Sequence, residues 1–278
     1  MDCVYINLDR AADRRAALEH NFAETRIEGW SLSRFPAVDG ADAAGVAGRT
    51  GDAEKACFLS HRALIRAHRD GPHPILVLED DAVFGAHSCA AIDRLLAEQA
   101  RDLDWDILFT DICVPSPQTM IELIRLRRRL SAASQTALLN LANVPFAGST
   151  AYIVNGKAKA RLCGLLDAPA SLDLPYDLHL ARLVGERSIA AFAVFPFLTS
   201  LSGFSETSSI QHDSGQDSDL VWNAFRKMMW LDRDLAAQRA MLAEIDTALG
   251  DEESRMFGLL LSAMTSEKYR DKLGPPTG

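Results

Sequence analysis

Residues 75–82 read Ile75-Leu76-Val77-Leu78-Glu79-Asp80-Asp81-Ala82, a run of four apolar residues followed by three acids. A short apolar run bounded by turn signals is typical of a strand buried on both faces of a parallel sheet. Three consecutive carboxylates then end the strand, and they repel one another and lose solvation unless a cation neutralises them. Ligands of open α/β sheets bind at the carboxyl ends of strands, which is where these acids fall.

A hard divalent cation such as Mn²⁺ or Mg²⁺ suits this position, because such cations take oxygen ligands and share them with substrate phosphates. A nucleotide diphosphate bridged to the acids by the cation is one interpretation. An acidic surface turn at a strand end is the alternative, and the triplet alone does not separate the two.

Strands and helices alternate on both sides of this stretch. Asp9 is the expected N-cap of the first helix and Asp52 that of a later one. The pattern predicts an α/β fold with a mostly parallel sheet flanked by helices. We expect strands at 3–8, 32–38, 75–78, 105–109, 147–154 and 189–195, helices at 9–23, 53–68, 88–100 and 156–166, a long helix or helical hairpin at 120–143, and loops at 39–51 and 199–219.

The periodicity changes near residue 220. Apolar residues then recur at helical spacing up to residue 249, and a shorter apolar helix is expected at 256–264. We therefore predict a domain at 1–212 and a C-terminal helical extension at 213–278. The extension either packs on the α/β body or forms the seam of a homodimer.

Composition and charge limit the class of protein. The chain has 278 residues, 48% of them hydrophobic and 24% charged, as in ordinary globular proteins. Its formal net charge of −9 argues against nucleic acid as a partner. The five cysteines are scattered and odd in number, which argues against a disulfide framework and a zinc site. Without a signal-like N-terminus or a long apolar span, we expect a cytoplasmic protein or one peripheral to the cytoplasmic face of the inner membrane.

Several short motifs occur in a fixed order. They are residues 4–10 with Arg14 and Arg15, then 57–61, 75–81, 105–108, 151–154 and 176–177. In order and spacing they resemble glycosyltransferase family 25, which includes bacterial lipooligosaccharide galactosyltransferases and collagen galactosyltransferases. The resemblance covers roughly residues 3–210. It implies a GT-A-type nucleotide-sugar-binding fold in which an acidic motif holds Mn²⁺ and the diphosphate of a UDP-sugar.

The resemblance also implies roles for the acids and for their neighbours. Asp81 and Glu79 would be the outer acids of the motif, with Asp81 as metal ligand and Asp80 and Glu79 toward the ribose or the waters of the metal. Asn7 and Arg14 follow the first strand, where such enzymes bind the nucleotide, and arginine suits diphosphate oxygens. The alternative for the arginines is a solvated helix face.

Ser60 and His61 lie within the expected helix 53–68. A donor-site contact is the functional interpretation for both, and a hydrogen-bonded core histidine is the alternative. His212, in the polar loop, is the candidate for a late metal ligand, although a surface loop is the simpler interpretation.

Asp177 follows Pro175 at a predicted helix start. Inverting sugar transfer needs a base that removes the proton of the acceptor hydroxyl, and Asp177 is the candidate. An acid favoured by the helix dipole is the alternative. Asp173 and Glu186 are weaker candidates.

The expected reaction moves a hexose, galactose from UDP-galactose, to a saccharide acceptor of lipopolysaccharide, lipooligosaccharide or another surface glycan. Two features depart from the family pattern: Ala56 replaces a glycine, and residues 110–117 carry no family signal. They support the alternative of a non-catalytic nucleotide-sugar-binding member. A metal-dependent phosphohydrolase ranks last, because no nucleophile-bearing pattern accompanies the acids.

A basic stretch at 125–129 is either a solvated helix face or a peripheral membrane contact beside the acceptor site.

Overall fold

The computed structural model describes residues 1–133, 135–204 and 216–233, and a few isolated residues between 240 and 260. In the described ranges a seven-stranded sheet has the order β2-β1-β3-β7-β5-β8-β6. Pairing makes β2, β1, β3, β5 and β8 run in one direction and β7 and β6 in the other. The strands are β1 (Asp2–Asn7), β2 (Ser31–Pro36), β3 (Ile75–Glu79), β5 (Ile107–Phe109), β6 (Ala137–Asn140), β7 (Ala151–Val154) and β8 (Ala191–Phe195).

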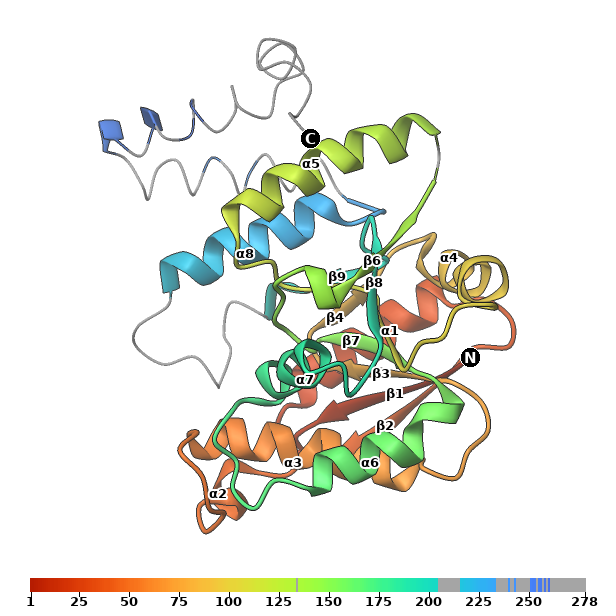
Figure 1. The fold of residues 1–278 in the computed structure, drawn as a ribbon, viewed down its shortest axis with the longest axis vertical. Coiled ribbons are helices and arrows are strands. Elements are labelled where there is room, and N and C mark those ends of the chain that lie inside the picture. Colours follow the sequence, from red (N-terminus) through yellow and green to blue (C-terminus); the bar gives the residue numbers. More distant parts are fainter. Residues whose placement is uncertain are drawn as a thin grey trace.

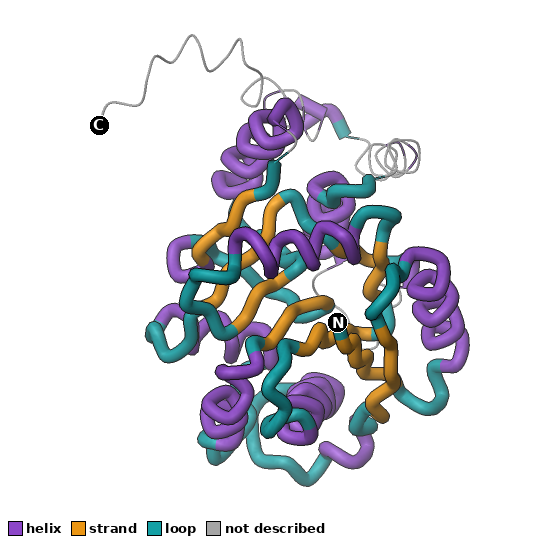
Figure 2. Tube along the Cα trace, turned by 90° about the vertical axis from the view of Figure 1, so that its right-hand side faces the viewer, coloured by secondary structure: helices purple, strands orange, loops and turns teal. Residues whose placement is uncertain are grey.

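Helices cover both faces of this sheet (Figures 1 and 2). Alternate residues of a strand point to opposite faces, so each strand contributes to two apolar cores. In β3, Ile75 and Val77 pack into one core and Leu76 and Leu78 into the other. The larger core is covered mainly by α3 (Asp52–Ala67), α6 (Lys159–Asp167), α7 (Tyr176–Gly185), α5 (Pro117–Ala133) and α8 (Gln216–Met229), and the smaller one by α1 (Ala12–Thr25) and α4 (Ser88–Arg94).

This architecture confirms the predicted α/β fold, and it is consistent with a GT-A-type glycosyltransferase fold. The direction of one neighbour of β3 differs from the expectation, because β3 is parallel to β1 but antiparallel to β7. Burial on both faces makes a strand apolar whichever way its neighbour runs, so the apolar run could not reveal this.

Three local predictions were wrong. Asp9 does not cap α1; Ala11 precedes the helix without a side-chain cap, and the Asp9 carboxylate accepts a hydrogen bond from Arg34. Gly51, one residue before Asp52, is the N-cap of α3. The stretch 120–143 is not wholly helical, since β6 pairs with β8. Leucine and alanine favour helix locally, but sheet pairing decides the conformation at 137–140.

Two further elements lie in stretches that were expected to be loops. A short helix, α2 (Gly40–Ala43), is capped by the side chain of Asp39. The strand β9 (Thr199–Leu201) pairs with β4 (Ala82–Phe84), which directly follows the acidic triplet. This second, two-stranded sheet fixes the direction in which the chain leaves the acids.

Of the predicted extension 213–278, mainly residues 216–233 lie within the described ranges. In α8, Ala224, Phe225 and Met229 are buried. Directly after the helix, Trp230 forms an isolated β-bridge with Phe197 of the α/β body. This part of the extension therefore packs on the body. Figure 1 shows α8 beside α5 across one end of the sheet.

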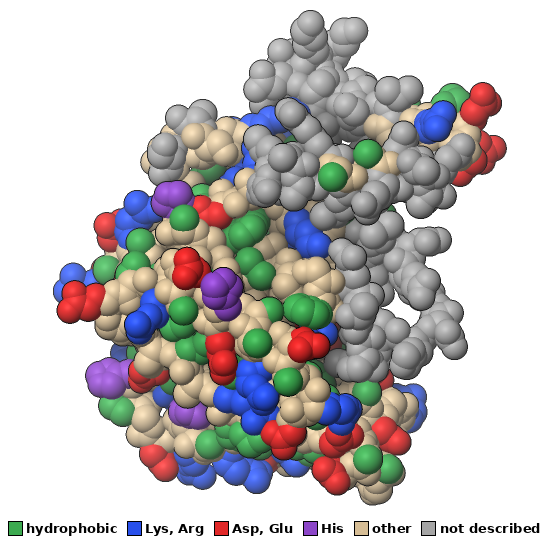
Figure 3. Space-filling view, turned by 180° about the vertical axis from the view of Figure 1, so that it is seen from behind, with side chains coloured by type: hydrophobic (Ala, Val, Ile, Leu, Met, Phe, Trp, Pro, Cys, Tyr) green, Lys and Arg blue, Asp and Glu red, His purple; other side chains and the backbone are tan. Residues whose placement is uncertain are grey.

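On the face drawn in Figure 3, Lys and Arg side chains are interspersed with Asp and Glu, so the described part of this face carries no large patch of one charge. None of the helices in the described ranges has both the length and the apolarity needed to cross a membrane.

Candidate functional site

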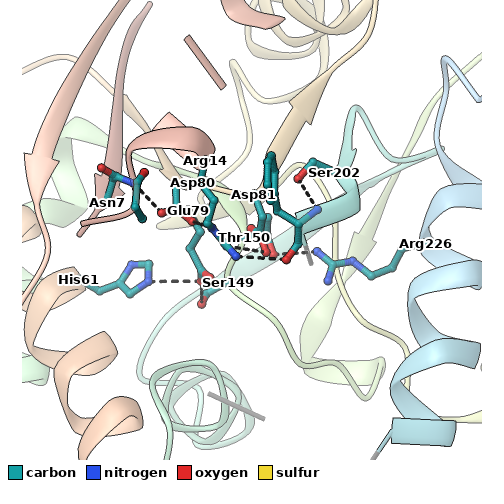
Figure 4. Close-up of polar contacts among 12 residues, drawn as sticks. Asn7, Arg14, His61, Glu79, Asp80, Asp81, Ser149, Thr150, Ser202 and Arg226 are labelled. Carbon is teal, nitrogen blue, oxygen red and sulfur yellow. Dashed lines mark hydrogen bonds and ion pairs between the residues drawn. The ribbon is translucent and has the colours of Figure 1, made fainter. Parts of the chain in front are cut away.

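The carboxyl ends of β1, β3 and β5 meet at one edge of the sheet, and the antiparallel β7 begins at this same edge. This arrangement brings together polar residues from distant parts of the chain (Figure 4). They are Asn7 at the end of β1, Glu79 at the end of β3, Asp80 and Asp81 directly after it, Thr110 and Asp111 after β5, and Ser149 and Thr150 before β7.

Glu79 lies between α3 and the start of β7. Its Oε1 accepts a hydrogen bond of 2.7 Å from Ser149 Oγ and lies 3.5 Å from His61 Nε2. Its backbone N–H donates to Thr150 O at 2.8 Å, which continues the β3–β7 pairing past the strand. Burial opposes ionisation, but the contact with His61 and the hydrogen bond from Ser149 outweigh it and lower the pKa of Glu79.

Asp80 points to the other side of the strand end, toward β1 and α1. It accepts hydrogen bonds of 2.7 Å from Asn7 Nδ2 and from Arg14 Nε. Asn7 is buried, and its Oδ1 accepts a hydrogen bond from Arg34 Nε at 3.1 Å. The remaining donors of Arg14 contact Phe204 O at 3.1 Å and Asp81 Oδ2 at 3.4 Å. Asn7 and Arg14 therefore hold the acidic turn in place.

Asp81 is the least compensated of the three acids. Its Oδ1 is buried without a hydrogen-bond partner, and its nearest cation is Arg14. Burial raises the pKa of Asp81 to about 7, and the charges of Glu79 and Asp80 add to this rise while those of Arg14 and Arg226 oppose it. A buried carboxylate oxygen that lacks a partner is the donor that a hard cation would use.

Ser60 and His61 lie on α3 and are buried. Ser60 Oγ donates to Ala56 O at 2.7 Å and accepts from Val38 N at 2.9 Å, so it holds the segment after β2 against the helix. His61 Nδ1 lies 2.9 Å from Tyr152 Oη.

Asp177 is the second residue of α7 and is half-buried. Its Oδ2 accepts a hydrogen bond from Gly148 N at 2.8 Å, and its Oδ1 accepts one from Leu178 N at 2.9 Å. Gly148 has a φ of +85°, which favours glycine, and this turn directs its N–H toward Asp177. Two backbone donors thus fix the orientation of the carboxylate.

Two cavities meet at the acidic turn. The first has a volume of about 340 Å³ and runs between β1, the segment after β2 and α3. The second, of about 180 Å³, lies between β7, α7 and α8. Glu79, Asp81 and Cys57 line both. Asn7, Arg14, Ser60, His61 and Asp80 line the first, and Asp177, Ser149, Thr150, Asn223 and Arg226 line the second.

The two weaker candidates for the base lie apart from this pair of cavities. Asp173 and Glu186 line a third cavity of about 590 Å³ beside α6 and α7. His212 lies outside the described residues. Ala56 lines the first cavity, where its methyl group occupies part of the wall.

The described part of the chain contains one group of three His, Cys, Asp or Glu residues whose ligand atoms lie within 4.8 Å of one another, and it is Cys57, His61 and Glu79. A hard cation at Asp81 would therefore draw its further oxygen ligands from Glu79, from a bound diphosphate and from water. The unpartnered Oδ1 of Asp81 fits such a cation.

Among the residues that sequence reasoning missed are Arg226 and Asp111. Arg226 of α8 donates to Asp111 Oδ2 through Nε at 3.1 Å and through Nη2, and its Nη2 also donates to Thr150 Oγ1 at 3.0 Å. Asp111 could have been found, because it follows β5 at the same strand edge as the acidic triplet. The helical periodicity of residues 216–229 contained no such signal for Arg226.

Comparison with protein families matches residues 1–179 to glycosyltransferase family 25 (LPS biosynthesis protein). The matched range includes all the motifs quoted from the sequence, from residues 4–10 to Tyr176 and Asp177. Comparison with curated proteins gives no match.

Proposed function

Because this chain belongs to glycosyltransferase family 25, we propose that it transfers galactose from UDP-galactose, with inversion, to a saccharide acceptor of lipopolysaccharide or lipooligosaccharide. The observation that carries this proposal is the wall of Glu79 and Asp81 shared by two cavities. Sugar transfer between two substrates needs two such spaces, joined at the reacting carbon.

The first cavity, the larger of the two that share this wall, is the proposed donor site. Its volume of about 340 Å³ lies within the range of small-molecule sites, and polar groups of Asn7, Arg10 and Arg14 line it. Arg14 is already bound to Asp80 and Asp81, so we assign it the role of orienting the acids. Ser60 fixes the opposite wall through Val38.

Asp81 and Glu79 are the proposed ligands of Mn²⁺ or Mg²⁺. When bound, the cation supplies Lewis-acid stabilisation of the negative charge on the diphosphate leaving group. The protein contributes a rigid setting: Ser149 holds Glu79, Arg14 lies beside Asp81, and the Ser202 N–H donates to Asp81 O at 2.8 Å. Pre-organised groups of this kind need little rearrangement during the reaction.

The smaller cavity is the proposed acceptor site, and Asp177 in its wall is the proposed base. As the acceptor oxygen attacks the anomeric carbon, its proton passes to the Asp177 carboxylate, and the bond between that carbon and the diphosphate oxygen breaks. The N–H groups of Gly148 and Leu178 orient the carboxylate and leave lone pairs on its oxygens for this proton. A single displacement converts the α-linkage of UDP-galactose into a β-linkage.

Ala56 in the wall of the donor cavity supports a second candidate, a protein that binds nucleotide sugars without transfer. UDP release from UDP-galactose and Mn²⁺, measured with and without truncated lipooligosaccharide, separates the two. Transfer requires release stimulated by the acceptor and a β-galactoside in the product by NMR. UDP-galactose binding without stimulated release would identify the binding protein.

A further inference from the structure

Cys57, His61 and Glu79 converge on one point in the wall between the two cavities. Cys57 and His61 lie one turn apart on α3 and so share a face of the helix, and Glu79 ends β3 opposite them. Cys57 Sγ, one ring nitrogen of His61 and a carboxylate oxygen of Glu79 lie within 4.8 Å of one another. The scattered cysteines argue against a zinc site in the sequence alone. That argument could not include this group, because its third member, Glu79, comes from a strand distant from α3 in the sequence.

The His61 ring is held in one orientation, and its Nε2 contacts Glu79 without a hydrogen bond of normal length. His61 is 1% exposed, stacks on Tyr176 with ring centroids 4.2 Å apart, and contacts Tyr152 Oη through Nδ1 at 2.9 Å. Its Nε2 is buried without a hydrogen-bond partner and faces Glu79 Oε1 at 3.5 Å.

The position of the proton on the His61 ring decides what this geometry can hold: if Tyr152 donates to Nδ1, the N–H at Nε2 faces Glu79 and no further charge is needed. If Nδ1–H donates to Tyr152, Nε2 carries a lone pair, and a lone pair that faces a carboxylate oxygen is repelled by it. A proton on Nε2 or a metal ion between the atoms removes this repulsion. The contact between Nδ1 and Tyr152 is the kind of outer contact that fixes the tautomer of metal-binding histidines.

The three donors suit zinc better than manganese or magnesium. Thiolate and imidazole select Zn²⁺, whereas oxygen donors select Mg²⁺ and Mn²⁺. Bonds to zinc of about 2.0–2.3 Å place neighbouring ligand atoms roughly 3–4 Å apart, so the group needs only a small closing movement. Glu54, Asp81 and Asp177 line the same cavity as Cys57 and add negative charge around it.

We propose that Cys57, His61 and Glu79 form a binding site for Zn²⁺ with three protein ligands. Cys57 and Glu79 line both cavities, so the fourth coordination position opens to solvent or to a bound ligand. On binding, the Cys57 thiol proton is released to water and a bond from sulfur to zinc forms. This site is distinct from the hard-cation position at Asp81, although Glu79 contributes to both. The proposal does not depend on sugar transfer.

The first test uses Co²⁺ as a spectroscopic substitute for Zn²⁺ in the full chain. We expect one Co²⁺ per protein, with a thiolate-to-cobalt charge-transfer band that one equivalent of Zn²⁺ removes. The Cys57→Ala variant should lose the band. Cys163→Ala, which removes another buried thiol on α6, is the matched control and should keep it. A band that is absent from the wild type, or that survives in Cys57→Ala, overturns the proposal.

The second test measures zinc affinity by competition with a chromophoric chelator. His61→Gln should weaken binding at least about ten-fold, and Tyr152→Phe, which removes only the outer contact, about ten-fold or more. Asp80→Asn should leave the affinity unchanged, because Asp80 faces Arg14 instead. Circular dichroism checks that each variant is folded, and Glu79→Gln replaces His61→Gln if that variant is not. Zinc affinity equal to wild type in folded His61→Gln, or in Glu79→Gln where that variant replaces it, would overturn the proposal and leave His61 only as a partner of Glu79.

Discussion

Arg226 of α8 and Asp111, which follows β5, form an ion pair in which both side chains are buried. Burial disfavours both charges: at Arg226 the contact with Asp111 outweighs burial and raises the pKa of the guanidinium, whereas at Asp111 burial outweighs Arg226 and raises the pKa of the carboxyl. Arg226 also donates to Thr150, two residues after Gly148. The pair thus ties a helix beyond the family-matched residues to the strand edge that carries the acids.

Removal of one partner should destabilise the protein strongly. We expect Arg226→Met to lower the free energy of unfolding by about 3–5 kcal/mol, because it leaves Asp111 buried and unpaired. The double variant Arg226→Met/Asp111→Asn should lose less free energy of unfolding than the sum of the losses in Arg226→Met and in Asp111→Asn. Arg182→Met is the control, since its ion pair with Glu186 is exposed and should contribute at most about 1 kcal/mol. Urea denaturation measures all four; equal losses in Arg226→Met and Arg182→Met would contradict the assignment.

The raised pKa of Asp81 predicts how stability depends on pH without metal. The ordinary pKa is 3.8 and the folded value about 7, so the folded protein holds a proton that the unfolded chain releases. Stability from this group is present below about pH 4 and is lost as the pH rises through 7. We compare the free energies of unfolding of Asp81→Asn and wild type in EDTA. As the pH rises from 4.5 to 8, the difference should shift in favour of Asp81→Asn, by at most about 4 kcal/mol.

Asp80→Asn is the control for this measurement. It removes the ionic partner of Arg14 and should destabilise the protein at both pH values. Saturating Mn²⁺ should reduce the advantage of Asp81→Asn at pH 8, because the cation compensates the wild-type carboxylate. A pH-independent difference between Asp81→Asn and wild type would show that Asp81 titrates normally.

Asp177→Asn should separate binding from transfer. A base acts on the acceptor proton in the transition state, so the variant should keep the wild-type affinity for UDP and lose roughly 10²- to 10⁴-fold in kcat. Asp173→Asn and Glu186→Gln, which change acids in the third cavity, should retain full activity. Wild-type turnover in Asp177→Asn removes this residue from the mechanism, and loss of UDP affinity moves it to the donor site.

The basic stretch of α5 divides into two parts. Arg127 is buried and donates to Trp230 O at 2.9 Å, so it joins α5 to the end of α8, whereas Arg128 and Arg129 are exposed. If α5 contacts anionic glycolipid, Arg128→Gln/Arg129→Gln should raise the apparent KM for a phosphorylated lipid acceptor. Each cation near an anionic surface contributes about 1 kcal/mol, and salt weakens it.

The matched control for that variant is Arg94→Gln/Arg101→Gln, which removes the same charge from exposed positions around α4. It should leave acceptor kinetics and liposome co-sedimentation unchanged. If both double variants behave alike at low salt, α5 presents only a solvated face.

The acidic strand end was predictable because its signals are local. A continuous apolar run, turn residues before it and acids after it all lie within about ten residues, and they indicate a buried strand with a ligand edge. The proximity of Asn7 and Asp80, 73 residues apart, followed from the rule that parallel strands end at one edge.

Contacts between elements that are distant in sequence could not be predicted in this way. Arg226 lies on a helix whose pattern shows only which face is apolar, and its pairing with Asp111 depends on how α8 docks. Likewise, β6 pairs with β8 although its leucines and alanine also suit a helix. Tertiary packing decides both, and local sequence does not contain it.

Calorimetric titration of UDP in the presence of Mn²⁺, repeated in EDTA, shows whether the acidic wall binds the nucleotide through a metal ion. We predict one UDP per chain with Mn²⁺, no measurable binding in EDTA, and loss of the Mn²⁺-dependent binding in Asp81→Asn but not in Asp173→Asn. Equal UDP affinity with Mn²⁺ and with EDTA, or in folded Asp81→Asn and wild type, would contradict the assignment of the acidic wall as the metal and nucleotide site.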